Sequence, residues 1–459
     1  MRFLDVLFES TPRIANALLF HFKAVAFQAR RLMRNLLIVP AKRYQQGDSL
    51  ITESILAESR TPLFSGEVAA ELPLEAGKVH NLRIAIRALN SVEVPANSVF
   101  SFWAQVGYPG ALKGYARGRE LREGCLIPSV GGGLCQLSNA LYDAALQAGF
   151  TIVERHKHSQ IVPGSLAEID RDATVFWNYV DLRFKSATPF RIEASMTADH
   201  LKVRFRSSGT VKQVSRAPLI LGRPAIIRGP ESCATCSIDT CFRHIDRSNL
   251  PRVFGRTAWL VDECWPEFDK YIQSHRTAKD ILCAPLDGHR HNRPSYAWNT
   301  RGFGCVRHAR VATLRRAVAS RRLASQGAAR QHALLKHDEP MARSFASTLS
   351  YDVTHVVVMQ NLLPFLWRDG HLGGRTFDVL MTRLPIDTLQ ARLDHAAELH
   401  PERNTLSDFR ADDSLATAER EALRRARTLI TSPRSKNSGK IAAAACEIEI
   451  SALKSPYQL

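Results

Sequence analysis

Three consecutive glycines stand directly before a predicted helix, and they constrain the fold of this chain more than any other feature. Gly131, Gly132 and Gly133 permit backbone conformations closed to other residues and a close approach to a ligand. The apolar residues that follow recur at helical spacing, which predicts a helix beginning near Cys135 and ending at Gly149. The sequence therefore predicts a tight turn that holds a thiol at a helix N-terminus.

Cys135 is the candidate reactive group at this turn, because the free N–H groups and dipole of a helix N-terminus favour a thiolate. His156 and His158 follow the next predicted strand, and either imidazole could take the thiol proton. Asp170 or Asp172 could then orient that imidazole as the third member of a triad. Backbone N–H groups of the glycine turn could stabilise an oxyanion, so the pattern favours nucleophilic catalysis.

Two arginines close to these histidines are candidate substrate ligands. Arg155 would help to hold a thiolate or a substrate carboxylate, and Arg171 could bind a carboxylate through two parallel hydrogen bonds. A glycine turn before a helix also binds anions without any catalysis. A lone cysteine that faces a core is usually inert. Catalysis by Cys135 and simple anion binding by residues 131–133 therefore both stay open.

The 459 residues are enough for two or three domains. Residues 1–65 are predicted to be a basic helical segment, and residues 66–210 an α+β domain. A connector with prolines and cysteines spans residues 211–250, and an α/β region follows over residues 251–459. Within the second segment, strands are expected at 97–103, 150–153, 173–179, 181–185, 190–196 and 201–205, with a long irregular connection over 107–133.

Several motifs, taken in chain order, resemble the VanW family. They occupy residues 97–102, 131–142, 154–159, 171–175 and 181–184. The resemblance covers roughly residues 79–196, about a quarter of the chain. It implies an α+β VanW-like domain followed by the α/β domain.

The resemblance also implies a function connected with the cell envelope. The family is named after a vancomycin-resistance gene cluster, and some members act as L,D-transpeptidases on peptidoglycan stem peptides through the cysteine of this motif. For this chain it implies that Cys135 accepts the acyl group, with His156 or His158 moving the proton. The alternatives are a non-enzymatic module that binds an anionic cell-wall precursor and a glycosyltransferase-related assembly factor.

The C-terminal part carries a weaker resemblance. Residues 351–432 are similar to the N-terminal half of glycosyltransferases of the GT-B fold, through residues 351–364 and 371–375. In that fold the sugar nucleotide binds mainly to the other half. The expected role is therefore acceptor or partner binding and not sugar transfer by this chain alone.

A cysteine cluster lies in the predicted connector. Cys233, Cys236, Cys241 and His244 follow the pattern C-x2-C-x4-C-x2-H. Such soft ligands suit one structural zinc, and thiolates also hold iron–sulfur clusters. The metal would pin the connector and would have no catalytic role. The alternative is a group of reduced thiols.

The charge balance favours an anionic partner, since 62 Lys+Arg against 44 Asp+Glu give a net charge of +18. No nucleic-acid-binding motif accompanies the basic residues, so we expect a cell-wall precursor or another anionic small molecule instead. Residues 14–39 could form a helix that contacts an anionic membrane peripherally, or one packed on its own domain. No signal peptide or membrane-spanning run is recognised, and nine cysteines indicate a reducing compartment, so a cytoplasmic or membrane-peripheral location is expected.

Overall fold

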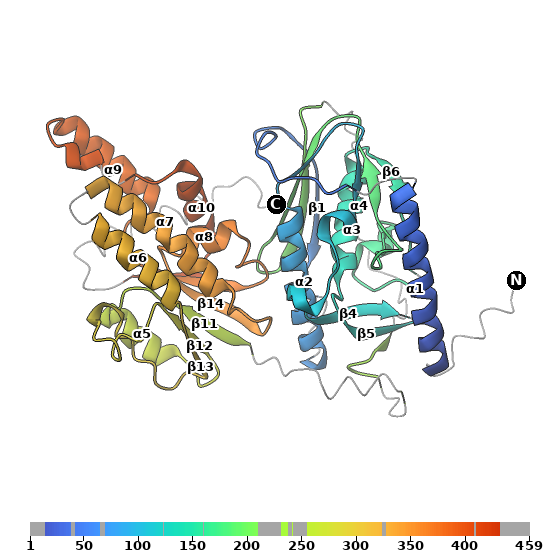
Figure 1. The fold of residues 1–459 in the computed structure, drawn as a ribbon, viewed down its shortest axis with the longest axis horizontal. Coiled ribbons are helices and arrows are strands. Elements are labelled where there is room, and N and C mark those ends of the chain that lie inside the picture. The colour runs from blue at the N-terminus through green and yellow to red at the C-terminus, as the bar shows by residue number, and fades with distance from the viewer. Residues whose placement is uncertain are drawn as a thin grey trace, which may run out of the picture. The chain divides into compact units, whose positions relative to one another are not determined.

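The computed structural model describes residues 14–37, 42–64, 69–122, 124–158, 160–209, 231–236, 241, 255–323, 327–407 and 410–431. The chain divides into two compact units, Met1–Val253 and Phe254–Leu459 (Figure 1). Both mix helices and strands, and each has its own buried apolar residues. Within the described residues, no helix is both long enough and apolar enough to cross a membrane.

The first unit is built around a four-stranded antiparallel sheet in the order β1-β9-β8-β2. Two small sheets accompany it, in the orders β3-β7-β6 and β10-β5-β4. Its elements are α1 (Ile14–Leu37), β1 (Ile55–Pro62), α2 (Leu72–Leu89), β2 (Val92–Val94), β3 (Val99–Ser101), α3 (Phe102–Val106), β4 (Arg117–Arg122), β5 (Cys125–Val130), α4 (Leu134–Gln147), β6 (Thr151–Glu154), β7 (Arg183–Lys185), β8 (Phe190–Met196), β9 (His200–Arg206) and β10 (Glu231–Ser232).

Helix α4 is held in place by an aromatic core under the main sheet. It packs on β1 and β9, whose inward side chains alternate with exposed ones. Phe150 follows α4, and its ring lies 4.7 Å from that of Phe190 and 5.1 Å from that of Phe205. These large buried rings hold the C-terminal end of α4 at the sheet, because aromatic side chains dominate the burial energy of such a core.

Two predicted segments of this unit differ from the observed structure. Residues 173–179 form a loop and not a strand, because their backbone bonds to other partners. Ala173 N donates to the Asn139 side chain, its carbonyl accepts from Ser138, and Thr174 N donates to His156 O. The connection over 107–133, predicted to be irregular, contains the antiparallel hairpin β4–β5.

The predicted basic helical segment also differs. Residues 14–37 are helical, but β1 lies within the segment and pairs with β9 over its whole length. Residues 55–62 thus belong to the main sheet of the first unit.

The second unit is a six-stranded, all-parallel sheet in the order β13-β12-β11-β14-β15-β16. This confirms the predicted later α/β domain, whose strand order is that of doubly wound sheets. Its elements are β11 (Arg256–Leu260), α5 (Pro266–His275), β12 (Ile281–Ala284), β13 (Cys305–His308), α6 (Arg310–Arg322), α7 (Gly327–Ala346), β14 (Val353–Met359), α8 (Leu363–Arg368), β15 (Thr376–Met381), α9 (Ile386–Leu399), α10 (Asp413–Leu423) and β16 (Thr428–Thr431). Helix α10 ends at Leu423, and β16 follows it.

A buried ion network lies where the strand order reverses, beyond the carboxyl ends of β11 and β14. Arg316 donates to both carboxylate oxygens of Asp262 and, at 3.0 Å, to Asp338. Asn361 also donates to Asp262, at 2.8 Å, and Tyr296 accepts from Arg316. Burial lowers the pKa of Arg316, but the aspartates outweigh it and raise the pKa overall.

Candidate active site

The glycine turn adopts the conformation that its residues make possible. Gly131 and Gly133 have φ values of 79° and 97°, in the left-handed region, and Gly133 caps α4. A Cβ on Gly132 would lie 2.5 Å from the backbone of Gly118 in the neighbouring strand β4. The turn is therefore closed to larger residues, and it brings β4 against the start of α4.

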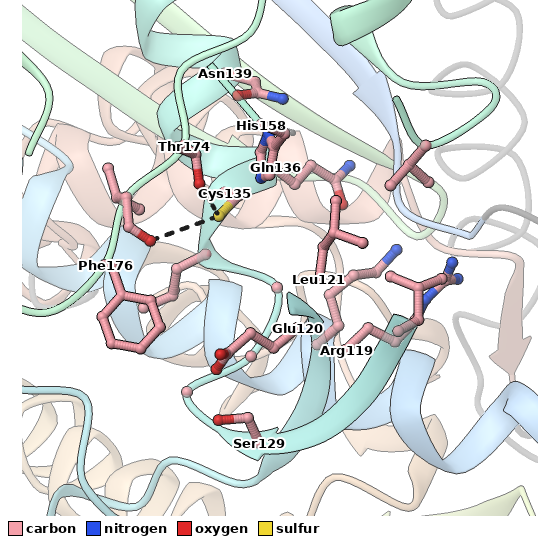
Figure 2. A pocket seen from close by; sticks show the side chains of 18 of the residues that line it. Arg119, Glu120, Leu121, Ser129, Cys135, Gln136, Asn139, His158, Thr174 and Phe176 are labelled. Atoms are coloured by element: carbon pink, nitrogen blue, oxygen red, sulfur yellow. Dashed lines mark hydrogen bonds between the residues drawn. The ribbon is translucent and has the colours of Figure 1, made fainter. Parts of the chain in front are cut away.

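Cys135 lies in the first turn of α4, partly accessible and against the apolar core. Its Sγ is 3.6 Å from Thr174 Oγ1 and 3.7 Å from Val175 O, as the dashed lines in Figure 2 mark. Both contacts come from the loop that replaces the predicted strand. The loop thus fixes the direction of the thiol.

His158 connects Cys135 to a carboxylate. Its Nδ1 lies 2.5 Å from Asp172 Oδ1, and its backbone N–H donates to Oδ2 of the same residue. The ring lies beside the Cys135 thiol in Figure 2, close enough to lower the pKa of that thiol. The side chains of His158 and Asp172 are 14% and 7% exposed, so the pair is shielded from competing water. Cys135, His158 and Asp172 form a continuous chain of the triad type.

The electrostatics of this chain favour a charged pair. Burial raises the pKa of the Cys135 thiol, but the hydrogen bond and charge of His158 outweigh it and hold the pKa below its ordinary value of 9.0. Burial lowers the pKa of His158, whereas Asp172 and Cys135 raise it to about 10. Burial raises the pKa of Asp172, and His158 lowers it to below its usual range overall. Together these shifts favour the ion pair of a thiolate and an imidazolium over the neutral pair of thiol and imidazole.

The other predicted site residues lie elsewhere. His156 is near Glu154 Oε1, at 3.3 Å, with its side chain 48% exposed. Arg155 donates to Asp172 O at 2.6 Å and to the Asp170 carboxylate, which makes it a support of the Asp172 loop. Arg171 is buried, with its Nε 3.7 Å from Asp143. None of these three residues lines the cavity at Cys135.

That cavity has a volume of about 610 Å³. Cys135, His158 and the glycine turn line it together with both strands of the β4–β5 hairpin (Figure 2). Its wall also includes five aromatic side chains and three cationic ones: Phe64, Trp103, Tyr108, Phe176, Trp177, Lys78, Arg119 and Arg122. The grouping of these cationic side chains could not be predicted from the sequence, because they come from α2 and from a hairpin that was expected to be irregular. The cavity can hold a peptide-sized ligand with the thiol at its wall.

The proposed metal ligands are only partly within the described residues. Cys233 N donates to Leu126 O, and β10 pairs with β5, so this part of the connector lies beside the hairpin. Among the described residues, no three His, Cys, Asp or Glu side chains are grouped as metal ligands would be. His244 lies outside the described residues. Metal binding stays a prediction, which elemental analysis of anaerobically purified protein tests. One equivalent of zinc or iron would support it, and the absence of both metals would contradict it.

Comparison with known proteins agrees with this arrangement. Residues 77–206 match the family described as VanW like protein. The first unit carries a VanW-like domain. The chain is 33% identical over 145 residues to the uncharacterized protein YoaR of Bacillus subtilis (strain 168), covering 30% of this chain and 47% of YoaR.

A second relative is the vancomycin B-type resistance protein VanW of Enterococcus faecalis (strain ATCC 700802 / V583), 28% identical over 152 residues, or 32% of this chain and 55% of that protein. The chain thus spans about half the length of both curated relatives. No solved structure matches the chain, and the resemblance of residues 351–432 to glycosyltransferases gains no support. The matched stretch of the VanW-like domain contains Cys135, His158 and Asp172.

Proposed function

We propose that the VanW-like domain is a cysteine acyl-transfer enzyme that acts on cell-wall stem peptides, in the manner of an L,D-transpeptidase. One observation carries the proposal: Cys135 and His158 lie on the wall of a peptide-sized cavity, and Asp172 bonds to His158. A partly accessible thiol with a lowered pKa and an aligned imidazole are the parts that nucleophilic catalysis needs.

The residues suit both halves of such a reaction. The Cys135 thiolate attacks the amide carbonyl that follows a diamino acid, and a C–S bond forms. The His158 imidazolium gives its proton to the departing amine of a D-amino acid as the C–N bond breaks, which leaves a thioester. An amine of a second stem, or water, then attacks the thioester and returns a proton to His158, which frees the thiolate. Asp172 holds the imidazole in position throughout.

The substrate class rests on a relative. VanW of Enterococcus faecalis is named a vancomycin B-type resistance protein, and the stem peptide is the substrate that the resemblance to this family implies. The aromatic and cationic wall of the cavity suits a peptide with anionic groups. A non-enzymatic module that binds an anionic cell-wall precursor would use the same cavity but would need no depressed thiol pKa. A glycosyltransferase-related assembly factor would instead bind a sugar nucleotide.

The test is the intact mass of the protein after incubation with a carbapenem and, separately, with a tetrapeptide stem. We expect an adduct on the wild type, no adduct on Cys135→Ala, and an unchanged adduct on Cys125→Ala. Cys125 is the matched control because it is also a partly exposed thiol, on the neighbouring strand β5. An adduct that survives in Cys135→Ala, or a thiol no more reactive than Cys125, would favour the binding module.

We also propose that α1 attaches the VanW-like domain to an anionic membrane surface. The helix contacts its own domain through Arg31, which bonds to Glu154 and Tyr179 O, through Gln28, which bonds to Trp177 O, and through the ring of Phe27, which stacks on Tyr179. Phe22 and Val25, 74% and 64% exposed, lie on the outside with further apolar residues. Helix α1 contains no acidic residue. An outward apolar face flanked by cations is typical of interfacial helices.

Vesicle sedimentation tests this attachment. We expect the protein to bind phosphatidylglycerol-rich vesicles more strongly than phosphatidylcholine vesicles, and the double variant Phe22→Asn, Val25→Asn to lose that binding. Leu112→Asn serves as the control, because Leu112 is equally exposed but lies outside α1. Equal sedimentation of the double variant and the wild type would overturn the proposal.

A further inference from the structure

Lys78 of α2 is a buried cation in the wall of the Cys135 cavity. The residue is 8% exposed. Within the described part of the chain, its ammonium makes no hydrogen bond and no ion pair within 4 Å. A buried ammonium without a counter-ion is unfavourable, so it needs a reason beyond folding.

The nearby carboxylates are engaged by another residue. Arg119 lies 2.9 Å from Glu75 Oε1 and 3.5 Å from Glu71 Oε2. Burial, and then the charge of Arg119, lowers the pKa of Lys78 to about 8, although the two glutamates raise it in part. A bound anion would supply the missing negative charge and keep the ammonium protonated.

The position of Lys78 links it to the reactive helix. A Cβ on Gly133, the N-cap of α4, would lie 2.2 Å from Lys78 Cγ, so the lysine stem lies directly on the glycine turn. Helix α4 has 14 residues, and its first N–H groups and dipole add positive potential at this end. The lysine stem and the helix N-terminus therefore lie side by side in the wall of the cavity that Cys135 also lines.

We propose that Lys78 and the N-terminus of α4 form a carboxylate-binding subsite, which receives the free C-terminal carboxylate of the peptide attacked by Cys135. This rests on the proposed acyl transfer and adds a specificity: the domain recognises a chain end and cleaves next to it. The subsite takes the role that the sequence suggested for Arg155 and Arg171, whose guanidinium groups are engaged outside the cavity.

Direct binding tests the subsite without any chemistry at the thiol. Cys135→Ala protein is titrated with a tetrapeptide stem that ends in a carboxylate and with the same peptide ending in an amide. We expect the carboxylate form to bind about tenfold more tightly, and the preference to vanish in Cys135→Ala, Lys78→Met. Equal affinity of the two peptides for Cys135→Ala would overturn the subsite.

Alkylation separates this proposal from the acyl-transfer proposal. Iodoacetate and iodoacetamide both form a C–S bond with loss of iodide, but only the first is an anion. We expect Lys78→Met to lower the ratio of their rates at Cys135 about tenfold, with the iodoacetamide rate retained. Lys185→Met is the control, because Lys185 is an exposed lysine on β7 that does not line the cavity, and its ratio should equal that of the wild type. A ratio equal to the wild-type value in Lys78→Met would overturn the subsite while leaving a nucleophilic Cys135 intact.

The stability of Lys78→Met excludes a structural explanation. Methionine has a similar length and no charge to bury, so we expect a thermal midpoint at or above that of the wild type. A lower midpoint together with an unchanged rate ratio would identify Lys78 as a structural residue and end the proposal.

Discussion

Two buried charge networks, one in each unit, join an aspartate to a cationic side chain but differ in what surrounds them. In the VanW-like domain, Asp172 holds His158, and His158 in turn contacts a thiol on a cavity wall. In the second unit, Arg316 is enclosed by Asp262 and Asp338, with Tyr296 and Asn361 as further partners.

The difference shows how a buried charge network at a candidate catalytic site can be distinguished from a structural one. Asp262 accepts from Arg316 and Asn361, and it ties α6 to the ends of β11 and β14. Its partners are all protein groups, so the network satisfies itself. His158, by contrast, lies beside a nucleophilic atom on a cavity wall and can transfer a proton during a reaction there. Shifted pKa values occur in both networks, and only the accessible reactive atom separates a candidate site from a structural one.

The largest expected effect is on the reactive thiol. Cys135→Ala should abolish acyl adducts altogether, because the variant has no atom to form the thioester. Asp262→Asn should leave the rate of adduct formation within about twofold of the wild type, since its network contacts no nucleophile. Mass spectrometry of both variants after carbapenem treatment checks this. A large loss of adduct in a folded Asp262→Asn would show that the two networks are coupled.

The next effect is on stability, in the opposite unit. Arg316→Met should lower the free energy of unfolding of the second unit by about 3–5 kcal/mol, because it leaves two buried carboxylates without their counter-ion. Urea denaturation followed by tryptophan fluorescence measures the change. Arg343→Met is the control, since the Arg343 side chain is 62% exposed and should matter little. Similar midpoints for both variants would contradict a structural role of the network.

His158→Gln should slow the alkylation of Cys135 by iodoacetamide about 10- to 100-fold at pH 7. Without the imidazolium, burial raises the thiol pKa, and each unit removes about nine-tenths of the thiolate. The rise in rate with pH should therefore move to higher pH. His156→Gln is the control because His156 lies beside Glu154 and outside the cavity. A shifted profile in His156→Gln alone would reverse the assignment of the base.

Asp172→Asn should have the smallest effect on the reaction rate of the Cys135 thiol. It should instead change the pH above which acyl transfer falls. Asp172 helps raise the pKa of His158 to about 10, so acyl transfer that needs the imidazolium should fall as pH rises through that value. In Asp172→Asn the fall should begin at lower pH. For stability the sign is the same: the contribution of His158 is present below its ordinary pKa of 6.5 and is lost as pH rises through about 10. The pH–rate profile measures the shift, and an unmoved alkaline limb would count against Asp172.

The sequence predicted the elements whose signals are local. The strand over 190–196, the helix that begins at the glycine turn and a later α/β region all depend on short-range periodicity, and all are observed. The strand predicted over 173–179 does not form, because the side chains of Asn139 and Ser138 in α4 form hydrogen bonds with the backbone of Ala173. Such competition between distant segments is not visible in a local sequence pattern. The hairpin β4–β5 was missed because its strands are rich in charged residues and glycine.

The site was predictable in its members but not in their roles. Cys135, His158 and Asp172 were all named as candidates, yet two histidines and two aspartates stayed equivalent until the loop at 172–175 was folded against α4. Lys78 could not be found, because a lysine on an amphipathic helix is normally exposed. It is buried because a Cβ on the preceding Gly77 would lie 1.9 Å from Arg117 O, a contact that brings α2 onto β4.

The pairing of β1 with β9 has a consequence for modularity. Seven of the residues in β1 have partners in β9, although the strands are separated by about 140 positions in sequence. The VanW-like domain therefore begins and finishes on adjacent strands, which makes it a cassette that can be inserted into a host loop or circularly permuted. The family match, residues 77–206, omits β1. A fragment cut to that match would leave β9 as an open edge, prone to pair with other chains, whereas a fragment that starts before β1 would close it.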